Sequence, residues 1–252
     1  MAETMEKNLK LTIEYDGTDY HGWQVQPNGP SVQQAIESAI ETMTREKIKL
    51  IASGRTDAGV HALGQVANFT CCTKIAPDAF HKGLNSILPD DIVIRDVVEV
   101  PARFHARYDA VSKLYRYRIL NQPLPSAMER RYAWWIRTPL DLTAMALAAA
   151  QLVGEHDFKA FEGTGSPRAH TVRKVMAADV NGDRPGLITV DVQANGFLRY
   201  MVRNIVGTLV DVGMHKMETD RISTILKSKD RSQAAATAPA RGLFLIQVDY
   251  GT

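Results

Sequence analysis

Segments with the periodicity of β-strands alternate with segments of helical periodicity along both halves of the chain. Residues 9–15 alternate between apolar and polar side chains, as expected for a half-buried strand. Ser31 and Gln34 have the spacing of a capping box, and the apolar residues that follow at helical spacing predict a helix over 32–45. Because strands and helices each bury one face, this order constrains the chain to packed layers of both.

The same criteria predict the remaining elements. Strands are predicted over 48–52, 65–72, 92–100, 115–120, 172–180, 187–194 and 243–250, and helices over 77–87, 141–154, 197–213 and 219–228. We expect a hairpin turn at Asn181-Gly182-Asp183. Since the pattern repeats after a break near 101–112, we predict an α+β fold. It consists of two related α/β units with mainly antiparallel sheets flanked by helices, as domains 1–104 and 105–252.

The composition excludes several classes of protein. The 252 residues are 45% hydrophobic, which is enough apolar mass for a core. Cys71 and Cys72 are adjacent and would point to opposite faces of a strand, so neither an intrachain disulfide nor a CxxC zinc site is expected. The first residues lack the apolar region of a secretory signal, and no apolar run approaches the ~20 residues that cross a bilayer. We therefore expect a cytoplasmic protein without a membrane segment.

Basic and aromatic side chains are interleaved in the middle of the chain. Residues 103–118 carry five Lys or Arg against one Asp, together with Phe104, Tyr108, Tyr115 and Tyr117. RNA binding requires cations that pair with phosphates and rings that stack on bases, although the formal net charge is only +2. The same pattern also fits a solvated strand face with core aromatics. Our candidates for an RNA track are the arginines Arg107, Arg116, Arg130, Arg131, Arg168 and Arg199.

Arg199 and Arg203 are four residues apart, which places them on one face of the predicted helix 197–213. Two surface arginines would explain this spacing. An arginine with apolar neighbours also often holds a carboxylate, because a buried guanidinium group needs a partner. Both interpretations stay open from the residues alone.

The segment 53–65 is a polar loop with three glycines between two predicted strands. Two of the glycines have the spacing of a phosphate-binding P-loop, but Val60 and His61 replace the lysine and the Ser/Thr that such a loop requires. The chain has no HExxH motif, so no metal site is expected. Asp57 alone is typical of a turn or a helix cap, and the residues by themselves leave its role open.

The loop strongly resembles the GRTDAGVHA signature of the tRNA pseudouridine synthase A family, at residues 54–62 of this chain. Further matches follow in the family's order: Tyr15-Asp16-Gly17, Gly22-Trp23-Gln24-Val25-Gln26, Leu84-Asn85, Leu88-Pro89-Asp90-Asp91, Phe104-His105-Ala106-Arg107, Tyr115-Arg116-Tyr117, Met201-Val202-Arg203-Asn204-Ile205-Val206-Gly207, Ala238-Pro239-Ala240 and Gly242-Leu243. Residues 1–7 have no counterpart, and 157–174 match loosely. Motifs in this order are highly specific, and they cover nearly the whole chain.

The resemblance implies isomerisation of uridine to pseudouridine at position 38, 39 and/or 40 of the tRNA anticodon stem-loop. It implies a homodimer that works without a metal or cofactor, with an active-site cleft between two α/β halves. Asp57 corresponds to the family's catalytic aspartate, and Tyr115 and Arg203 correspond to its active-site tyrosine and arginine. Arg55 corresponds to a residue that helps to turn out the target base.

Pseudouridine formation makes these residue types sensible. A carboxylate can attack C1′ of the sugar or take a proton from the sugar, and a base must later remove the proton from C5. We expect Arg203 to keep Asp57 ionised, because a close guanidinium group lowers the pKa of a carboxyl group. We expect Tyr115 to stack on the flipped base. Two other functions stay open, a non-catalytic RNA-binding protein and an enzyme that acts on a small sugar phosphate.

Overall fold

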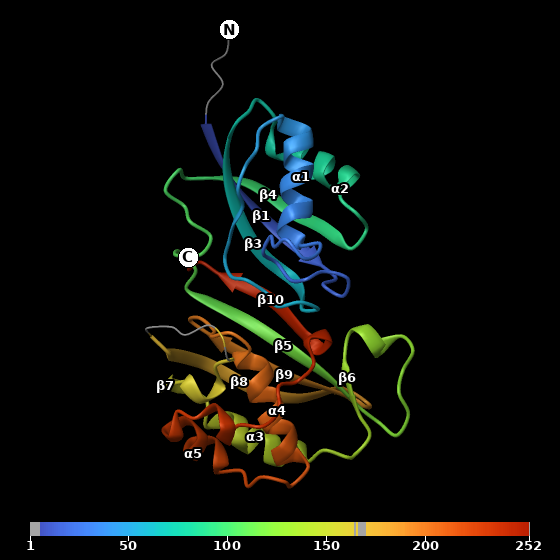
Figure 1. The fold of residues 1–252 in the computed structure, drawn as a ribbon, viewed down its shortest axis with the longest axis vertical. Coiled ribbons are helices and arrows are strands. Elements are labelled where there is room, and N and C mark those ends of the chain that lie inside the picture. Colours follow the sequence, from blue (N-terminus) through green and yellow to red (C-terminus); the bar gives the residue numbers. More distant parts are fainter. Residues whose placement is uncertain (1–5, 164, 166–169, 252) are drawn as a thin grey trace. The chain divides into compact units, whose positions relative to one another are not determined.

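Two compact units make up the structure, a computed structural model that describes residues 6–163, 165 and 170–251 (Figure 1). Unit 1 consists of the chain up to Val111 together with the residues from Leu245 onward. Unit 2 spans Ser112–Phe244. The chain therefore leaves unit 1 once and returns to it with its last strand.

The segment 105–111 lies within unit 1. Tyr250 Oη donates a hydrogen bond to Ala106 O (2.8 Å), and Val111 N donates to Asp249 O (2.8 Å). These bonds join the segment to the returning end of the chain. The domain boundary between residues 104 and 105 stays a prediction. The first compact unit ends at Val111 and the second begins at Ser112, seven residues after that boundary.

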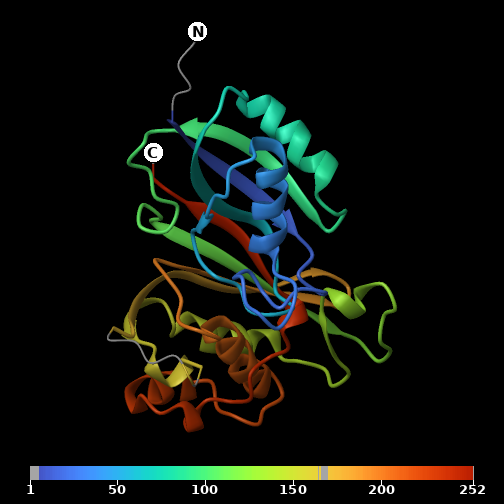
Figure 2. The ribbon, with the colours of Figure 1, turned by 45° about the horizontal axis from the view of Figure 1, so that its top comes forward.

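Unit 1 is built on a mainly antiparallel sheet. Its strands lie in the order β4 (Ile92–Val100), β1 (Glu6–Tyr15), β3 (His61–Cys72) and β10 (Leu243–Asp249), and β2 (Ile51–Ala52) pairs with β3. Strand β1 is antiparallel to both β3 and β4. The helices α1 (Val32–Thr44) and α2 (Pro77–Ile87) lie against one face of these strands (Figure 1, Figure 2).

Strand β1 and helix α1 form for the reasons that the sequence indicates. Leu9, Leu11 and Ile13 are fully buried on one face of β1, as their alternation predicts. Ser31 Oγ accepts a hydrogen bond from Gln34 N (3.3 Å) and caps α1. The predicted strand at 9–15 and helix at 32–45 are confirmed.

Unit 2 is likewise built on mainly antiparallel strands. Its strands lie in the order β5 (Ser112–Asn121), β9 (Leu187–Ala194), β8 (Val172–Arg184) and β7 (Gly154–Asp157), and β6 (Trp134–Ile136) runs parallel to β5. The helices α3 (Leu142–Ala150), α4 (Met201–Gly213) and α5 (Arg221–Ser228) lie on one side of it (Figure 1). Short 3₁₀ helices follow at η1 (Glu129–Arg131), η2 (Lys159–Phe161), η3 (Arg231–Gln233) and η4 (Ala240–Gly242). The predicted fold class, mixed with mainly antiparallel sheets and flanking helices, is confirmed.

The predicted turn at Asn181-Gly182-Asp183 is wrong. Strand β8 continues to Arg184, and the hairpin turns at Pro185 and Gly186, where Gly186 has φ +78°. Proline fixes φ near −65° at the first turn position, and glycine accepts a positive φ at the second. The turn therefore forms at the Pro-Gly pair, and the Asn-Gly pair lies at an irregularity of the β8–β9 register.

The predicted helix at 197–213 begins late, at Met201. Tyr200 precedes it with a left-handed backbone (φ 60°), which interrupts a helix that would otherwise extend further back. Arg199 therefore lies outside the helix. The strands β6 and β7 have 3 and 4 residues, too few for a periodic pattern to predict them.

Within residues 6–163, 165 and 170–251, no helix is long and apolar enough to cross a membrane. In the same part of the chain, no group of three or more His, Cys, Asp or Glu side chains is placed to hold a metal ion.

Candidate active site

The loop that carries Asp57 lies in unit 1 and spans residues 53–60, because strand β3 begins at His61. The buried side chain of Gln65 fixes its first residues: Ser53 Oγ donates to Gln65 Oε1 (2.7 Å), and Gln65 Nε2 donates to Gly54 O (3.0 Å). Buried amides bonded at both ends hold the backbone in one geometry. The glycine-containing loop is thus fastened to β3 just before the candidate carboxylate.

Thr56 is fastened on its side chain and on its backbone. Its Oγ1 lies 2.7 Å from Tyr15 Oη, and its carbonyl accepts from Trp23 N (3.1 Å). Burial raises the pKa of the Tyr15 phenol to about 12, so this hydroxyl stays protonated at neutral pH. A Cβ on Gly22 would lie 2.6 Å from Thr56 O, so the segment around Trp23 approaches the loop as closely as a glycine permits.

Asp57 follows at the start of a tight turn. Its carbonyl accepts from Val60 N (3.1 Å), and Gly59, with φ 75°, donates through its N–H to Tyr20 O (3.3 Å). Asp57 is half-buried, whereas Arg55 is exposed. The carboxylate therefore projects from a backbone held on both sides, which is how catalytic groups are kept in place.

The buried side chain of His61 closes the turn. His61 Nδ1 accepts from Gly17 N (3.1 Å) and lies 3.0 Å from Asp16 Oδ1. A Cβ on Gly17 would lie 2.0 Å from Val60 O, so only glycine fits there. The structure thus assigns to Tyr15-Asp16-Gly17 a packing role that spacing alone could not predict.

Tyr115 and Tyr117 lie on one face of β5 in unit 2, as their spacing predicts. Tyr115 is buried, and its ring meets the Phe197 ring edge-on, with centroids 4.9 Å apart. Tyr117 is fully buried and donates to Pro239 O (2.7 Å), while burial raises its pKa far above the ordinary value. Tyr117 therefore serves core packing in unit 2.

Arg203 lies in the first turn of α4 in unit 2, half-buried. Its Nε donates to Ala238 O (2.7 Å), and its guanidinium carbon lies 4.8 Å from the centroid of the Tyr200 ring. Arg199 contacts the same ring, at 4.6 Å, and donates to Tyr200 Oη (3.0 Å). The two arginines therefore converge on Tyr200, although they do not share a helical face as predicted.

The segment 231–240 holds Arg203 in place. The fully buried Asn204 anchors this segment to helix α4. Asn204 Oδ1 accepts from Thr237 Oγ1 (2.6 Å) and from an Arg231 guanidinium nitrogen (3.0 Å). Asn204 Nδ2 donates to Phe161 O (2.8 Å), and Ala238 N donates to Arg203 O (3.1 Å). These contacts fix the carbonyl that orients the Arg203 side chain. Sequence reasoning missed Asn204, for which the family motif gave the only signal.

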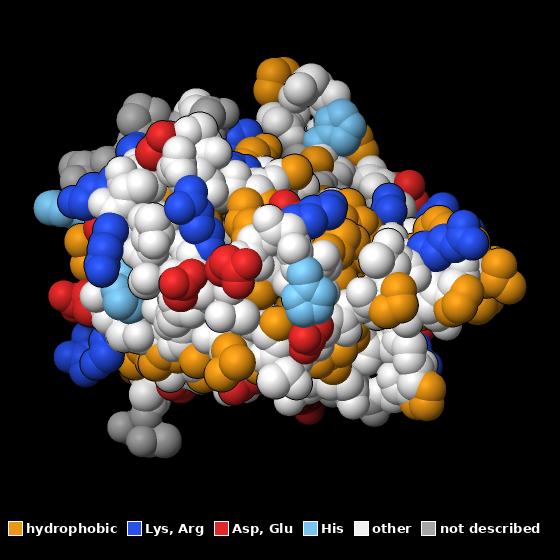
Figure 3. Space-filling view, turned by 90° about the horizontal axis from the view of Figure 1, so that it is seen from below, with side chains coloured by type: hydrophobic (Ala, Val, Ile, Leu, Met, Phe, Trp, Pro, Cys, Tyr) orange, Lys and Arg blue, Asp and Glu red, His pale blue; other side chains and the backbone are white. Residues whose placement is uncertain are grey.

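The candidate RNA-binding arginines differ in their surroundings. The Arg116 guanidinium group forms two hydrogen bonds to Asp191, Nε to Oδ1 (2.8 Å) and a terminal nitrogen to Oδ2 (2.7 Å). Arg107 is exposed beside Tyr108. Arg168 lies outside the described residues. Figure 3 shows one face of the molecule on which Lys and Arg side chains are scattered among acidic and hydrophobic ones.

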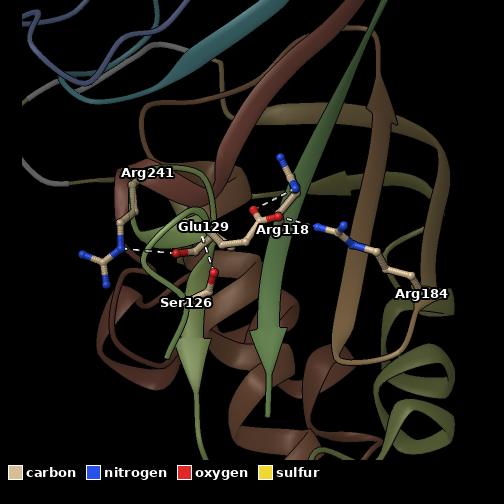
Figure 4. Close-up of polar contacts among 6 residues, drawn as sticks. Arg118, Ser126, Glu129, Arg184 and Arg241 are labelled. Carbon is tan, nitrogen blue, oxygen red and sulfur yellow. Dashed lines mark hydrogen bonds and ion pairs between the residues drawn. The ribbon is translucent and has the colours of Figure 1, made fainter. Parts of the chain in front are cut away.

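Arg130 and Arg131 are exposed on η1, in the segment between β5 and β6. Glu129 anchors this segment, because its carboxylate lies between the guanidinium groups of Arg118 (2.9 Å) and Arg184 (Figure 4). Glu129 N also donates to Ser126 Oγ (3.2 Å). An ion network on the sheet thus fixes the backbone that presents the two arginines.

The structure places the four residues of the predicted site in two groups. Arg55 and Asp57 belong to unit 1, on a turn with extensive backbone hydrogen bonding. Tyr115 and Arg203 belong to unit 2, each oriented by neighbours of its own unit. Hydrogen bonds or ring contacts orient residues of each group, as a preorganised site requires.

Comparison with known proteins gives a consistent result. The sequence model of a family described as tRNA pseudouridine synthase matches residues 11–109 and 148–251. A protein called tRNA pseudouridine synthase A from Thermoanaerobacter sp. (strain X514) is 47% identical over 244 residues, covering 97% of this chain and 100% of that protein. A protein of the same name from Moorella thermoacetica (strain ATCC 39073 / JCM 9320) is 49% identical over 244 residues, covering 96% of this chain and 99% of that protein. Because the family model matches most of this chain, the chain belongs to the tRNA pseudouridine synthase family.

Proposed function

We propose that this protein isomerises uridine to pseudouridine in tRNA, at position 38, 39 and/or 40 of the anticodon stem-loop. The observation that carries the proposal is the turn of Asp57, a carboxylate on a backbone fixed through Thr56 and Gly59 within the family's signature. We also propose, from the resemblance, that the protein acts as a homodimer in the cytoplasm and needs no cofactor.

The reaction breaks the bond between N1 and C1′ of uridine, rotates the uracil and joins C5 to C1′. The proton from C5 is lost and N1 gains one, so that atoms balance without a second substrate. In this proposal the Asp57 carboxylate either attacks C1′ or takes a proton from the sugar, and a base then removes the C5 proton. Both roles require an ionised carboxylate held in one orientation, which the hydrogen bonds of residues 53–60 support.

The base must leave its stack before it reacts, which costs a few kcal/mol. We propose that Arg55 helps to turn the base out and that Tyr115 stacks on it, which returns about 1–3 kcal/mol. Contact with Phe197 holds the Tyr115 ring in one orientation, so little side-chain entropy would be lost on binding. We propose further that Arg203, oriented through Ala238 O, contributes its charge to the reacting complex.

The direct test is tritium release from tRNA transcripts labelled at C5 of uridine. Wild type is expected to release tritium, and Asp57→Ala is expected to release none while still binding tRNA. Asp96→Ala is the matched control, because Asp96 is an exposed aspartate on β4 of the same unit. Tight tRNA binding by wild type without any release would instead identify a non-catalytic RNA-binding protein.

A further inference from the structure

Tyr108 is the aromatic residue of the segment 103–118 whose ring is presented to solvent. It is 74% exposed. The other three rings are packed: Phe104 lies 5.1 Å from the Tyr250 ring centroid, and Tyr115 and Tyr117 are buried in β5. Of the aromatic rings that this segment contributes to unit 1, Tyr108 is therefore the one that faces solvent.

The Tyr108 ring is held in place by its own turn. The His105 ring stacks on it, with centroids 4.2 Å apart and planes at 30°. His105 Nδ1 accepts from the backbone N–H groups of Arg107 and Tyr108 (3.2 Å each), and Asp109 Oδ2 accepts from His105 N (2.9 Å). An exposed tyrosine normally samples several rotamers, and the contact with the His105 ring favours one of them, which reduces the side-chain entropy lost on binding.

The turn is also fastened to the body of unit 1. Ala106 is fully buried; its N–H donates to Asn68 Oδ1 (2.9 Å), and its carbonyl accepts from Tyr250 Oη (2.8 Å). The side chain of Asn68 is itself buried in β3 and bonded to Asn8 (2.9 Å). These buried hydrogen bonds hold the backbone that carries the Tyr108 ring.

The surroundings of Tyr108 favour a polyanion over an apolar protein surface. The Arg107 guanidinium carbon lies 5.7 Å from the centroid of the ring, and Arg107 and Arg103 are both exposed. A ring that can stack on a base beside cations that can pair with phosphates is the arrangement that single-stranded RNA recognition uses. The neighbouring carboxylate of Asp109 accepts a hydrogen bond from His105 N, so it stabilises the turn.

We propose that Tyr108 is a stacking platform for an unpaired nucleobase of the RNA substrate, with Arg107 pairing with a nearby phosphate. The inference deepens the proposed function and rests on it, since it takes the substrate to be tRNA. The ring binds the RNA in the ground state and in the transition state alike. Its loss therefore raises KM and leaves kcat unchanged.

The test is a substitution series at Tyr108 with tRNA transcripts as the probe. Tyr108→Ala is expected to weaken tRNA binding by about 5- to 150-fold, which is the range for one lost base–aromatic stack. Tyr108→Phe and Tyr108→Trp keep a ring and are expected to bind like wild type. Tyr108→Leu keeps apolar area without a π-face and is expected to bind like Tyr108→Ala.

The salt dependence of tRNA binding distinguishes the role of Arg107 from that of Tyr108. Arg107→Ala is expected to reduce the slope of log Kd against log salt concentration by about 1, because one phosphate contact is lost. Tyr108→Ala is expected to leave that slope unchanged, since stacking releases no counterions. A reduced slope for Tyr108→Ala would contradict a stacking role.

Several results would overturn the inference. Wild-type affinity in Tyr108→Ala would remove the platform, and equal binding by Tyr108→Leu and Tyr108→Phe would indicate a general apolar contact. A weaker dimer by light scattering, with unchanged tRNA affinity, would show that Tyr108 meets a second copy of the chain. If wild type itself released no tritium, the proposed function would fail instead, so the two failures are distinguishable.

Discussion

Gly207 in helix α4 is the position where one added methyl group should disturb both the fold and the site. A Cβ on Gly207 would lie 1.9 Å from Ala236 O, which is backbone and cannot swing away. Alanine in place of glycine stabilises a helix interior by about 1 kcal/mol, whereas overpacking costs about 1–3 kcal/mol, occasionally more. Because this overlap is severe, we expect Gly207→Ala to lower the free energy of unfolding by about 2 kcal/mol net.

Calorimetry of the variant measures this effect. A loss of about 2 kcal/mol lowers the Tm of a chain of this size by about 4–8 °C. Gly83→Ala in α2 is the matched control, because its Cβ would meet the flexible end of Met43 (Cε, 2.4 Å), which can move aside. The Tm of the control is expected to stay level or rise.

The same variant should also affect turnover. Ala238, two residues after Ala236, supplies the carbonyl that orients the Arg203 side chain. Displacement of this segment is expected to lower the rate of tritium release at saturating tRNA more than it lowers tRNA affinity. A Gly207→Ala variant with wild-type Tm or above would refute the close approach of residues 235–238 to α4.

Asn204→Leu leaves the buried partners of its amide unsatisfied and is expected to cost about 2–4 kcal/mol in urea unfolding, with wild-type stability contradicting its anchoring role. Since burial raises the folded pKa of Tyr15 from 10.0 to about 12, its contribution of up to about 3 kcal/mol is present below pH 10 and lost between pH 10 and 12. Tyr15→Phe should therefore make the alkaline fall in stability less steep by about one proton, and an unchanged slope would show that Tyr15 is not responsible. Glu129→Ala leaves the arginines Arg118 and Arg184 facing each other and is expected to lower the free energy of unfolding by about 1 kcal/mol. In urea unfolding, about 1 M salt should reduce this loss, and a loss that grows with salt would contradict the ion network.

The regular elements could be predicted because their periodicity reflects burial. The alternation of residues 9–15 and the helical spacing of 32–45 follow directly from which side chains face the core. The strand boundary at His61 and the left-handed Tyr200 could not be predicted in this way, because they depend on contacts with residues distant in sequence. The turn at Pro185 and Gly186 was predictable in principle, since Pro-Gly is itself a turn signal.

The residues of the candidate site were harder to predict from the sequence than the fold. From the residues alone, Asp57 was indistinguishable from a turn former, and only the resemblance selected it. The parts that fix it, such as Gln65 and Gly17, act through single hydrogen bonds or one close approach, which leave no periodic pattern in a sequence. The exposure of Tyr108 also required the structure, because its neighbours in the same aromatic segment are packed.

We propose that this protein forms pseudouridine in the anticodon stem-loop of tRNA, with Asp57 as the essential carboxylate. The most direct measurement maps pseudouridine by carbodiimide labelling and primer extension on transcripts treated with wild type or Asp57→Asn. We expect stops at one or more of positions 38, 39 and 40 with wild type, and none with Asp57→Asn. Pseudouridine only at other positions would contradict the proposed target, and equal stops with Asp57→Asn would show that the Asp57 carboxylate is not essential.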